Sequence, residues 1–132
     1  MELIERKAVG AGVVEVHGKL IGSAENCEAF HEVFKGLLNT GIDNIIIDLT
    51  HSPWANSQGI GMLIGAHTSI INTGGKLVLS GVSERIKDVL AVTKLDRVFK
   101  TFDSEDGAVK YLTGKDPGSG DDRTGAQPPS GP

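Results

Sequence analysis

The stretch that decides the fold is NIIIDLTHSPWANSQGIGMLIG, residues 44–65. Residues 44–50 form an almost unbroken apolar run too short for a helix, which is typical of a strand buried on both faces of a mostly parallel sheet. A helix is predicted to begin near Ser57, because apolar side chains then recur along one helix face at Ile60, Leu63, Ile64 and Ile71. Function in open α/β sheets concentrates in loops beyond the carboxyl ends of strands, so Ser57 is the first candidate functional residue.

Strands and helices alternate through the rest of the chain. Short strands are predicted at residues 3–7, 12–17, 76–80 and 98–102. Ser23, Ser83 and Ser104 are each suited to cap the N-terminus of a helix. The resulting order, β-β-α-β-α-β-α-β-α, predicts an α/β fold with a mixed, mostly parallel sheet of about five strands and about four helices. The first strand is expected to be an antiparallel edge.

The composition indicates one domain followed by a tail. The chain has 132 residues, enough for one core, and its net charge of −4 argues against a nucleic-acid partner, which would require a basic face. Residues 1–113 are predicted to fold. Residues 114–132 contain five glycines and four prolines and are predicted to be a disordered tail.

The single cysteine and the absence of long apolar runs suggest a compartment. Cys27 excludes an intrachain disulfide and fits a reducing environment. It is predicted to be buried and inert, because it shares a helix face with other apolar side chains, namely Phe30, Val33, Phe34, Leu37 and Leu38. The sequence shows no signal-peptide core and no apolar run of membrane-spanning length, so we expect a cytoplasmic protein.

Several residue types near Ser57 also occur in catalytic and ligand sites. Asp48, His51 and Ser57 are the types found in a hydrolytic triad, but Ala55 stands where a nucleophile elbow needs glycine. The glycines around Ser57 lack the spacing of a phosphate-binding loop. The four histidines, His17, His31, His51 and His67, show no metal-ligand spacing. We therefore expect no enzyme activity, no metal and no cofactor.

Two roles remain for Ser57. It could simply be the N-cap of its helix, a common role for serine. Alternatively it is a phosphorylated serine, because a phosphate at a helix N-terminus is held by free backbone N–H groups and by the helix dipole. Such a charge would repel a partner that packs on the uncharged helix and on Trp54, without moving the fold.

The motifs in this order resemble the STAS domain family, in particular the bacterial anti-sigma factor antagonists. The family has Asp-(Leu or Phe)-Ser, a loop, and then Asp-Ser-Ser-Gly-(Leu or Ile)-Gly. This chain has Asp48-Leu49-Thr50 and Asn56-Ser57-Gln58-Gly59-Ile60-Gly61. Gly18-Lys19-Leu20 and Gly74-Gly75-Lys76-Leu77 also match, and the resemblance covers about residues 2–112.

The resemblance implies a small β/α sandwich that is not an enzyme. In the family, the unphosphorylated protein binds an anti-sigma factor that is also a serine kinase, and so frees a sigma factor. Phosphorylation of the serine at the position of Ser57 releases that partner, and a phosphatase resets the switch. This chain departs from the family at Asn56 and Ile21, where the family has acids, and at Gln58, where it has a second serine.

The predicted partner-binding surface combines two segments. It consists of Leu20, Ile21, Gly22, Ser23, Trp54, Asn56, Ser57, Gln58, Ile60 and Gly61. The alternative to a phosphorylation switch is a constitutive STAS adaptor of a transporter or signalling complex. The sequence leaves a homodimer open.

Overall fold

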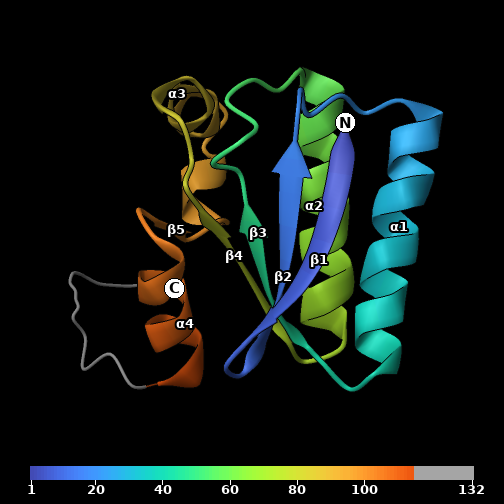
Figure 1. Ribbon diagram of the computed structural model, residues 1–132. Helices are drawn as coiled ribbons and strands as arrows, with labels where there is room; N and C mark the ends of the chain where they lie inside the picture. Colours follow the sequence, from blue (N-terminus) through green and yellow to red (C-terminus); the bar gives the residue numbers. More distant parts are fainter. Residues whose placement is uncertain (115–132) are drawn as a thin grey trace.

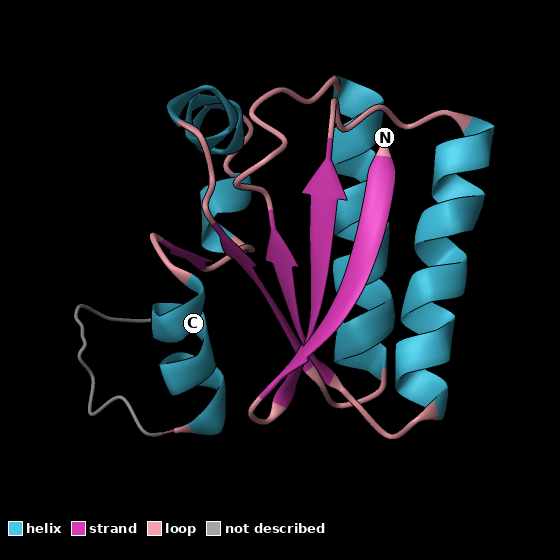
Figure 2. Cartoon of the chain, in the orientation of Figure 1, coloured by secondary structure: helices cyan, strands magenta, loops and turns pink. Residues whose placement is uncertain are grey.

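The computed structural model describes residues 1–114 and confirms the predicted order of elements (Figures 1 and 2). The strands are β1 (Glu2–Ala8), β2 (Ala11–His17), β3 (Asn44–Asp48), β4 (Lys76–Ser80) and β5 (Thr101–Phe102). The helices are α1 (Ala24–Asn39), α2 (Ser57–Asn72), α3 (Glu84–Val92) and α4 (Glu105–Thr113), with a 3-10 turn, η1 (Leu95–Arg97). The tail predicted from residue 114 lies, after Gly114, outside the described residues.

The five strands form one mixed sheet in the order β1-β2-β3-β4-β5. β1 pairs antiparallel with β2 at the edge, and the other pairs are parallel, as expected. Because each parallel strand is added on the same side of the one before, right-handed crossovers must place the connecting helices on one face. The core accordingly joins α1, α2 and α3 to that face, whereas α4 packs on the other (Figure 1).

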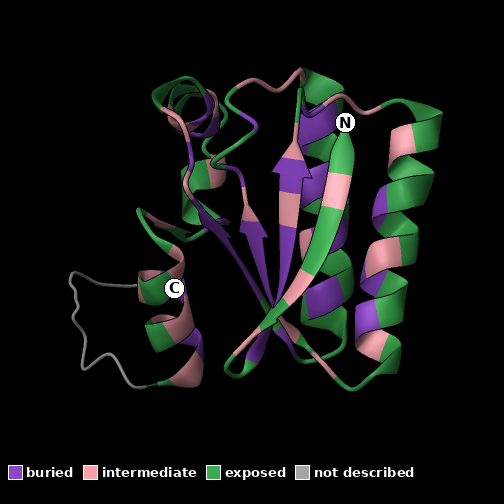
Figure 3. Cartoon of the chain, viewed as in Figure 1, coloured by how far each residue is buried: buried purple, intermediate pink, exposed green. Residues whose placement is uncertain are grey.

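The sheet is the centre of the core, as Figure 3 shows for its inner strands. In β3 the side chains of Ile45 and Ile47 face α1 and α2, and Ile46 faces α4. This confirms a strand buried on both faces.

α4 packs on β3, β4 and β5, and Ala11 and Val13 of β2 join the same core cluster. Beyond that cluster, this face of the sheet carries polar side chains at the carboxyl end of β2 and on β1, among them Arg6 and Glu15. All carboxyl ends of β2, β3 and β4 lie at one edge, where the candidate site forms.

The prediction that Cys27 is buried was wrong, and the predicted apolar stripe of α2 is only partly buried. Cys27 is exposed, because it lies on the rim of α1 beside a groove rather than under the helix. Ile64 and Ile71 are 39% and 48% exposed, since the buried arc of α2 is centred on Ala66 and Ile70 and ends at Ile60. The buried face of α2 therefore lies to one side of Ile64 and Ile71.

The last strand is also shorter than predicted. Only Thr101–Phe102 pair with β4, whereas the preceding residues form η1 after Lys94, which has a left-handed backbone (φ 62°). Phe99, within the predicted strand, instead inserts into the core and is 2% exposed. The apolar residues at 98–102 therefore serve partly to bury Phe99 in the core and only partly to form a strand.

His67 on α2 gives the fold a pH-dependent contribution. Its ring packs edge-on against Phe99, with centroids 5.3 Å apart, and burial lowers its pKa below the ordinary value of 6.5. The unfolded chain then takes up a proton at a higher pH than the folded chain, so this contribution is complete above about pH 7 and is lost as the pH falls below 6.5. We expect His67→Gln to show a smaller loss of stability between pH 7.5 and 5.5 in urea denaturation; an identical loss would contradict this assignment.

Candidate functional site

Two loops at the carboxyl ends of β2 and β3 pair with each other and build the site. Leu20 N–H donates to the Trp54 carbonyl (2.9 Å), and Asn56 N–H donates to the Leu20 carbonyl (3.2 Å). Leu20 and Ala55 thus form a parallel bridge beyond the main sheet. Segments 20–23 and 54–58, which were predicted to share a surface, are brought together by these bonds.

Asn56, not Ser57, caps α2. The Asn56 side chain accepts from Gly59 N–H (2.7 Å) and, more weakly, from Gly22 N–H (3.4 Å). The N-cap role considered for Ser57 is therefore wrong: Ser57 is the first residue inside the helix. Its exposed hydroxyl is left free for other chemistry at the positive end of the helix dipole.

Asn56 is expected to contribute to stability through this cap. Asn56→Ala removes the acceptor for Gly59 N–H and should lower the free energy of unfolding by about 1 kcal/mol. Asn56→Asp keeps the acceptor and should retain most of the stability. Chemical denaturation of the two variants checks this, and equal stabilities for the alanine and aspartate variants would contradict it.

Glycines allow the two loops to approach this closely. A Cβ on Gly59 would lie 1.9 Å from the Leu20 carbonyl oxygen, and one on Gly22 would lie 2.3 Å from the Gln58 carbonyl oxygen. Both distances are far below van der Waals contact with rigid backbone, so only glycine fits. By contrast, a Cβ on Gly61 would meet nothing within 4 Å. Gly59 therefore serves the close packing of α2 on the Leu20 loop, and Gly61 opens onto solvent.

Most, but not all, of the residues predicted to form the partner-binding surface are accessible to solvent. Ser23, Ser57, Gln58 and Gly61 are exposed, and Ile21, Gly22, Trp54 and Asn56 are half-buried. Leu20 and Ile60 are 0% and 4% exposed, so their inclusion is corrected: both belong to the core under the site. Sequence reasoning missed Lys19, whose ammonium group lies 5.3 Å from the centre of the Trp54 ring.

A groove between α1 and α2 begins beside Ser57. Its volume is about 530 Å³. It is lined by Cys27, Phe30, His31, Phe34, Lys35, Leu38, Asn39, Gln58, Gly61, Met62, Gly65, Ala66 and Ser69. Gln58 and Gly61 are therefore part of both the groove and the predicted contact surface, which extends the accessible region from the start of α2 along the helix.

Asp48, His51 and Ser57 do not form a hydrolytic triad in the described structure. Asp48 accepts from the backbone and hydroxyl of Thr50 (2.9 and 2.6 Å), and the His51 ring stacks on His17. Among residues 1–114, no hydrogen bond joins Ser57 to Asp48 or His51. The three residue types are close in sequence, but the arrangement lacks the bonded nucleophile and base that acyl transfer requires.

No helix within residues 1–114 is both long enough and apolar enough to cross a bilayer.

The surface around Ser57 carries no acidic side chain in the first turn of α2. Lys19, near Trp54, adds a positive charge beside this surface. Added negative charge at Ser57 would therefore change its electrostatic character.

Known proteins share both this sequence pattern and this fold. A curated relative from Thermotoga neapolitana, named as a candidate anti-sigma factor antagonist, is 30% identical over 92 residues, 69% of this chain and 81% of the relative. The crystal structure of a candidate anti-sigma factor antagonist from Thermotoga maritima is 25% identical, with a TM-score of 0.75 over 84% of this chain and 94% of that one.

Two further solved structures share the fold at lower identity. The anti-sigma factor antagonist SpoIIAA, in its unphosphorylated form, is 16% identical with a TM-score of 0.66, over 86% of this chain and 99% of that one. A sulfate transporter family protein from Wolinella succinogenes is 22% identical with a TM-score of 0.69, over 80% and 87%. The family model described as STAS domain matches residues 3–108. The chain belongs to the STAS domain family.

Proposed function

We propose that this protein is an anti-sigma factor antagonist that binds an anti-sigma factor with serine kinase activity through the surface around Ser57. The observation that carries the proposal is an exposed Ser57 at the first position of α2, within the motif shared with the family. The names of the Thermotoga relatives support the same assignment. The protein acts by binding, not by catalysis, in the cytoplasm.

Phosphorylation of Ser57 is the proposed release signal. A phosphoserine adds about −1.5 to −2 charges, and the free N–H groups of the first helical turn and the helix dipole stabilise that charge in place. The helix itself stays formed, because Asn56 supplies the cap independently of Ser57. The added charge then opposes a partner seated on Trp54 and Gln58, and a phosphatase restores binding.

A constitutive STAS adaptor is the alternative. It is favoured by the fold shared with the sulfate transporter family protein and by the neutral Asn56 and Ile21, which stand where anti-sigma factor antagonists have acids. In this case the same surface would hold a transporter or signalling subunit without modification. The two functions differ in whether Ser57 carries phosphate in the cell.

Intact-mass analysis of the protein purified from its own cells, followed by fragmentation, distinguishes the two functions. The switch predicts a species heavier by one phosphate, with the added mass on the peptide that contains Ser57. The matched control is Ser57→Ala expressed in the same cells, which should lose this species. An unmodified Ser57 under every growth condition would overturn the switch and favour the adaptor.

A further inference from the structure

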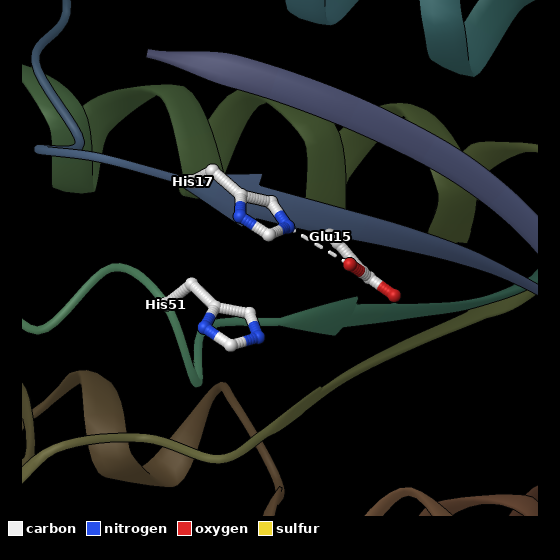
Figure 4. Close-up of side chains that lie close together, drawn as sticks. All are labelled: Glu15, His17 and His51. Atoms are coloured by element: carbon white, nitrogen blue, oxygen red, sulfur yellow. Dashed lines mark hydrogen bonds and ion pairs between the residues drawn. The ribbon is translucent and has the colours of Figure 1, made fainter.

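A second cluster of chemistry-bearing side chains lies outside the Ser57 surface. Glu15 and His17 project from the end of β2 onto the sheet face opposite α1 and α2, since Val14 and Val16, which alternate with them along the strand, face those helices. His51 comes from the loop after β3, and its ring stacks on that of His17 with centroids 4.5 Å apart (Figure 4). The Gly18 N–H donates to the His51 carbonyl (3.1 Å) and holds the two segments together.

The ligand atoms of the three side chains lie close together. One ligand atom from each of Glu15, His17 and His51 lies within 4.8 Å of the other two. The shortest contact joins His17 Nε2 to Glu15 Oε1 at 2.8 Å (Figure 4). The side chains of His17 and Glu15 are 31% and 17% exposed, and His51 is exposed, so an ion from solvent can reach them.

The surroundings orient Glu15 and favour a cation. Arg6 binds the other Glu15 oxygen, Oε2, and also pairs with Glu105 (2.6 Å) and, at 3.9 Å, with Asp48. These three carboxylates and one guanidinium leave two formal negative charges in the ion-pair cluster.

We propose that Glu15, His17 and His51 bind one divalent transition-metal ion of the Zn²⁺ class. Two imidazoles and one carboxylate form a set that Zn²⁺ accepts, with a fourth position open to water, whereas Ca²⁺ and Mg²⁺ prefer oxygen ligands. Ligand atoms around a tetrahedral Zn²⁺ lie about 3.4 Å apart. Because the His17 and His51 rings are stacked at an interplanar angle of 16°, the exposed His51 ring has to turn out of the stack to aim a nitrogen at the shared ion. Arg6 acts as the outer partner that fixes Glu15.

This site could not be read from the sequence, where we expected no metal. Ligand pairs on one element are recognised by close spacing, whereas His17 and His51 belong to different strands and their loops. Their meeting depends on the parallel pairing of β2 with β3, in which Glu15 lies opposite Asp48. The proposal does not depend on the function proposed for Ser57.

Isothermal titration of the untagged full chain with ZnCl₂ tests the proposal, with Co²⁺ absorption as a second readout. We expect one ion per chain, and at least about tenfold weaker binding for His17→Ala and for His51→Ala. Glu15→Gln, nearly the same shape, should also weaken binding. Circular dichroism confirms that each variant folds, and the exposed position of His51 makes its variant the safest for the fold.

Cys27 and His31 provide the matched control, because both are exposed and lie one helical turn apart on α1. The double variant Cys27→Ser/His31→Gln should bind Zn²⁺ as the parent does. Zn²⁺ binding that is lost in this double variant, that is undiminished in His17→Ala and His51→Ala, or that never saturates at one ion per chain would each overturn the proposal.

Discussion

Replacing Ser57 with aspartate is expected to weaken binding of the proposed partner, an anti-sigma factor, by about 100-fold. An uncompensated charge buried in an interface costs about 3 kcal/mol, which corresponds to that factor in Kd. The fold should be unaffected, because an acid in the first turn of α2 interacts favourably with the helix dipole and Asn56 still caps the helix. Surface plasmon resonance with the immobilised anti-sigma factor measures the loss.

Two controls make this result specific. Ser57→Ala removes the hydroxyl without adding charge and should retain binding. Thr68→Asp adds the same charge at an exposed position of the same helix, about 16 Å along its axis, and should have little effect. If Ser57→Asp binds within about threefold of the parent, the contact surface tolerates charge and the phosphorylation switch is wrong.

Gly59→Ala is expected to be the most destabilising single methyl addition among the glycines of α2. The new Cβ would lie 1.9 Å from the Leu20 carbonyl oxygen and 2.7 Å from its carbon, both of them backbone atoms. The loop cannot yield without losing the bond from Asn56 N–H to that oxygen. We expect the free energy of unfolding to fall by about 2–3 kcal/mol, measured by guanidinium denaturation.

Gly61→Ala is the matched control, since it makes the same chemical change two residues later in the same helix. Its Cβ would meet nothing within 4 Å, so the higher helix propensity of alanine should raise stability by up to about 1 kcal/mol. Opposite signs for the two substitutions are the expected result. Equal stability of Gly59→Ala and the parent would show that the loops do not approach as closely as described.

Local signals in the sequence were enough to predict the order of strands and helices, the mostly parallel sheet and the position of Ser57 at the start of a helix. The apolar run at residues 44–50, the serines that cap α1, α3 and α4, and the alternation of strands with helices are local signals. Their period and spacing specify each element, and the right-handed crossover rule then fixes the parallel core. The same local signals located Ser57 at the start of α2, although the cap itself is Asn56.

Which side chains meet across elements depends on the packing of the folded chain. The packing of α1, α2 and two loops sets the burial of Leu20 and Ile60 and the exposure of Cys27. It also sets the hydrogen bond from Gly22 N–H to the Asn56 side chain. No local period in the sequence encodes that packing. The meeting of His17 with His51 depends in the same way on the pairing of β2 with β3. Contacts between distant segments arise only when the sheet is assembled, which is why sequence spacing predicted the elements but not these sites.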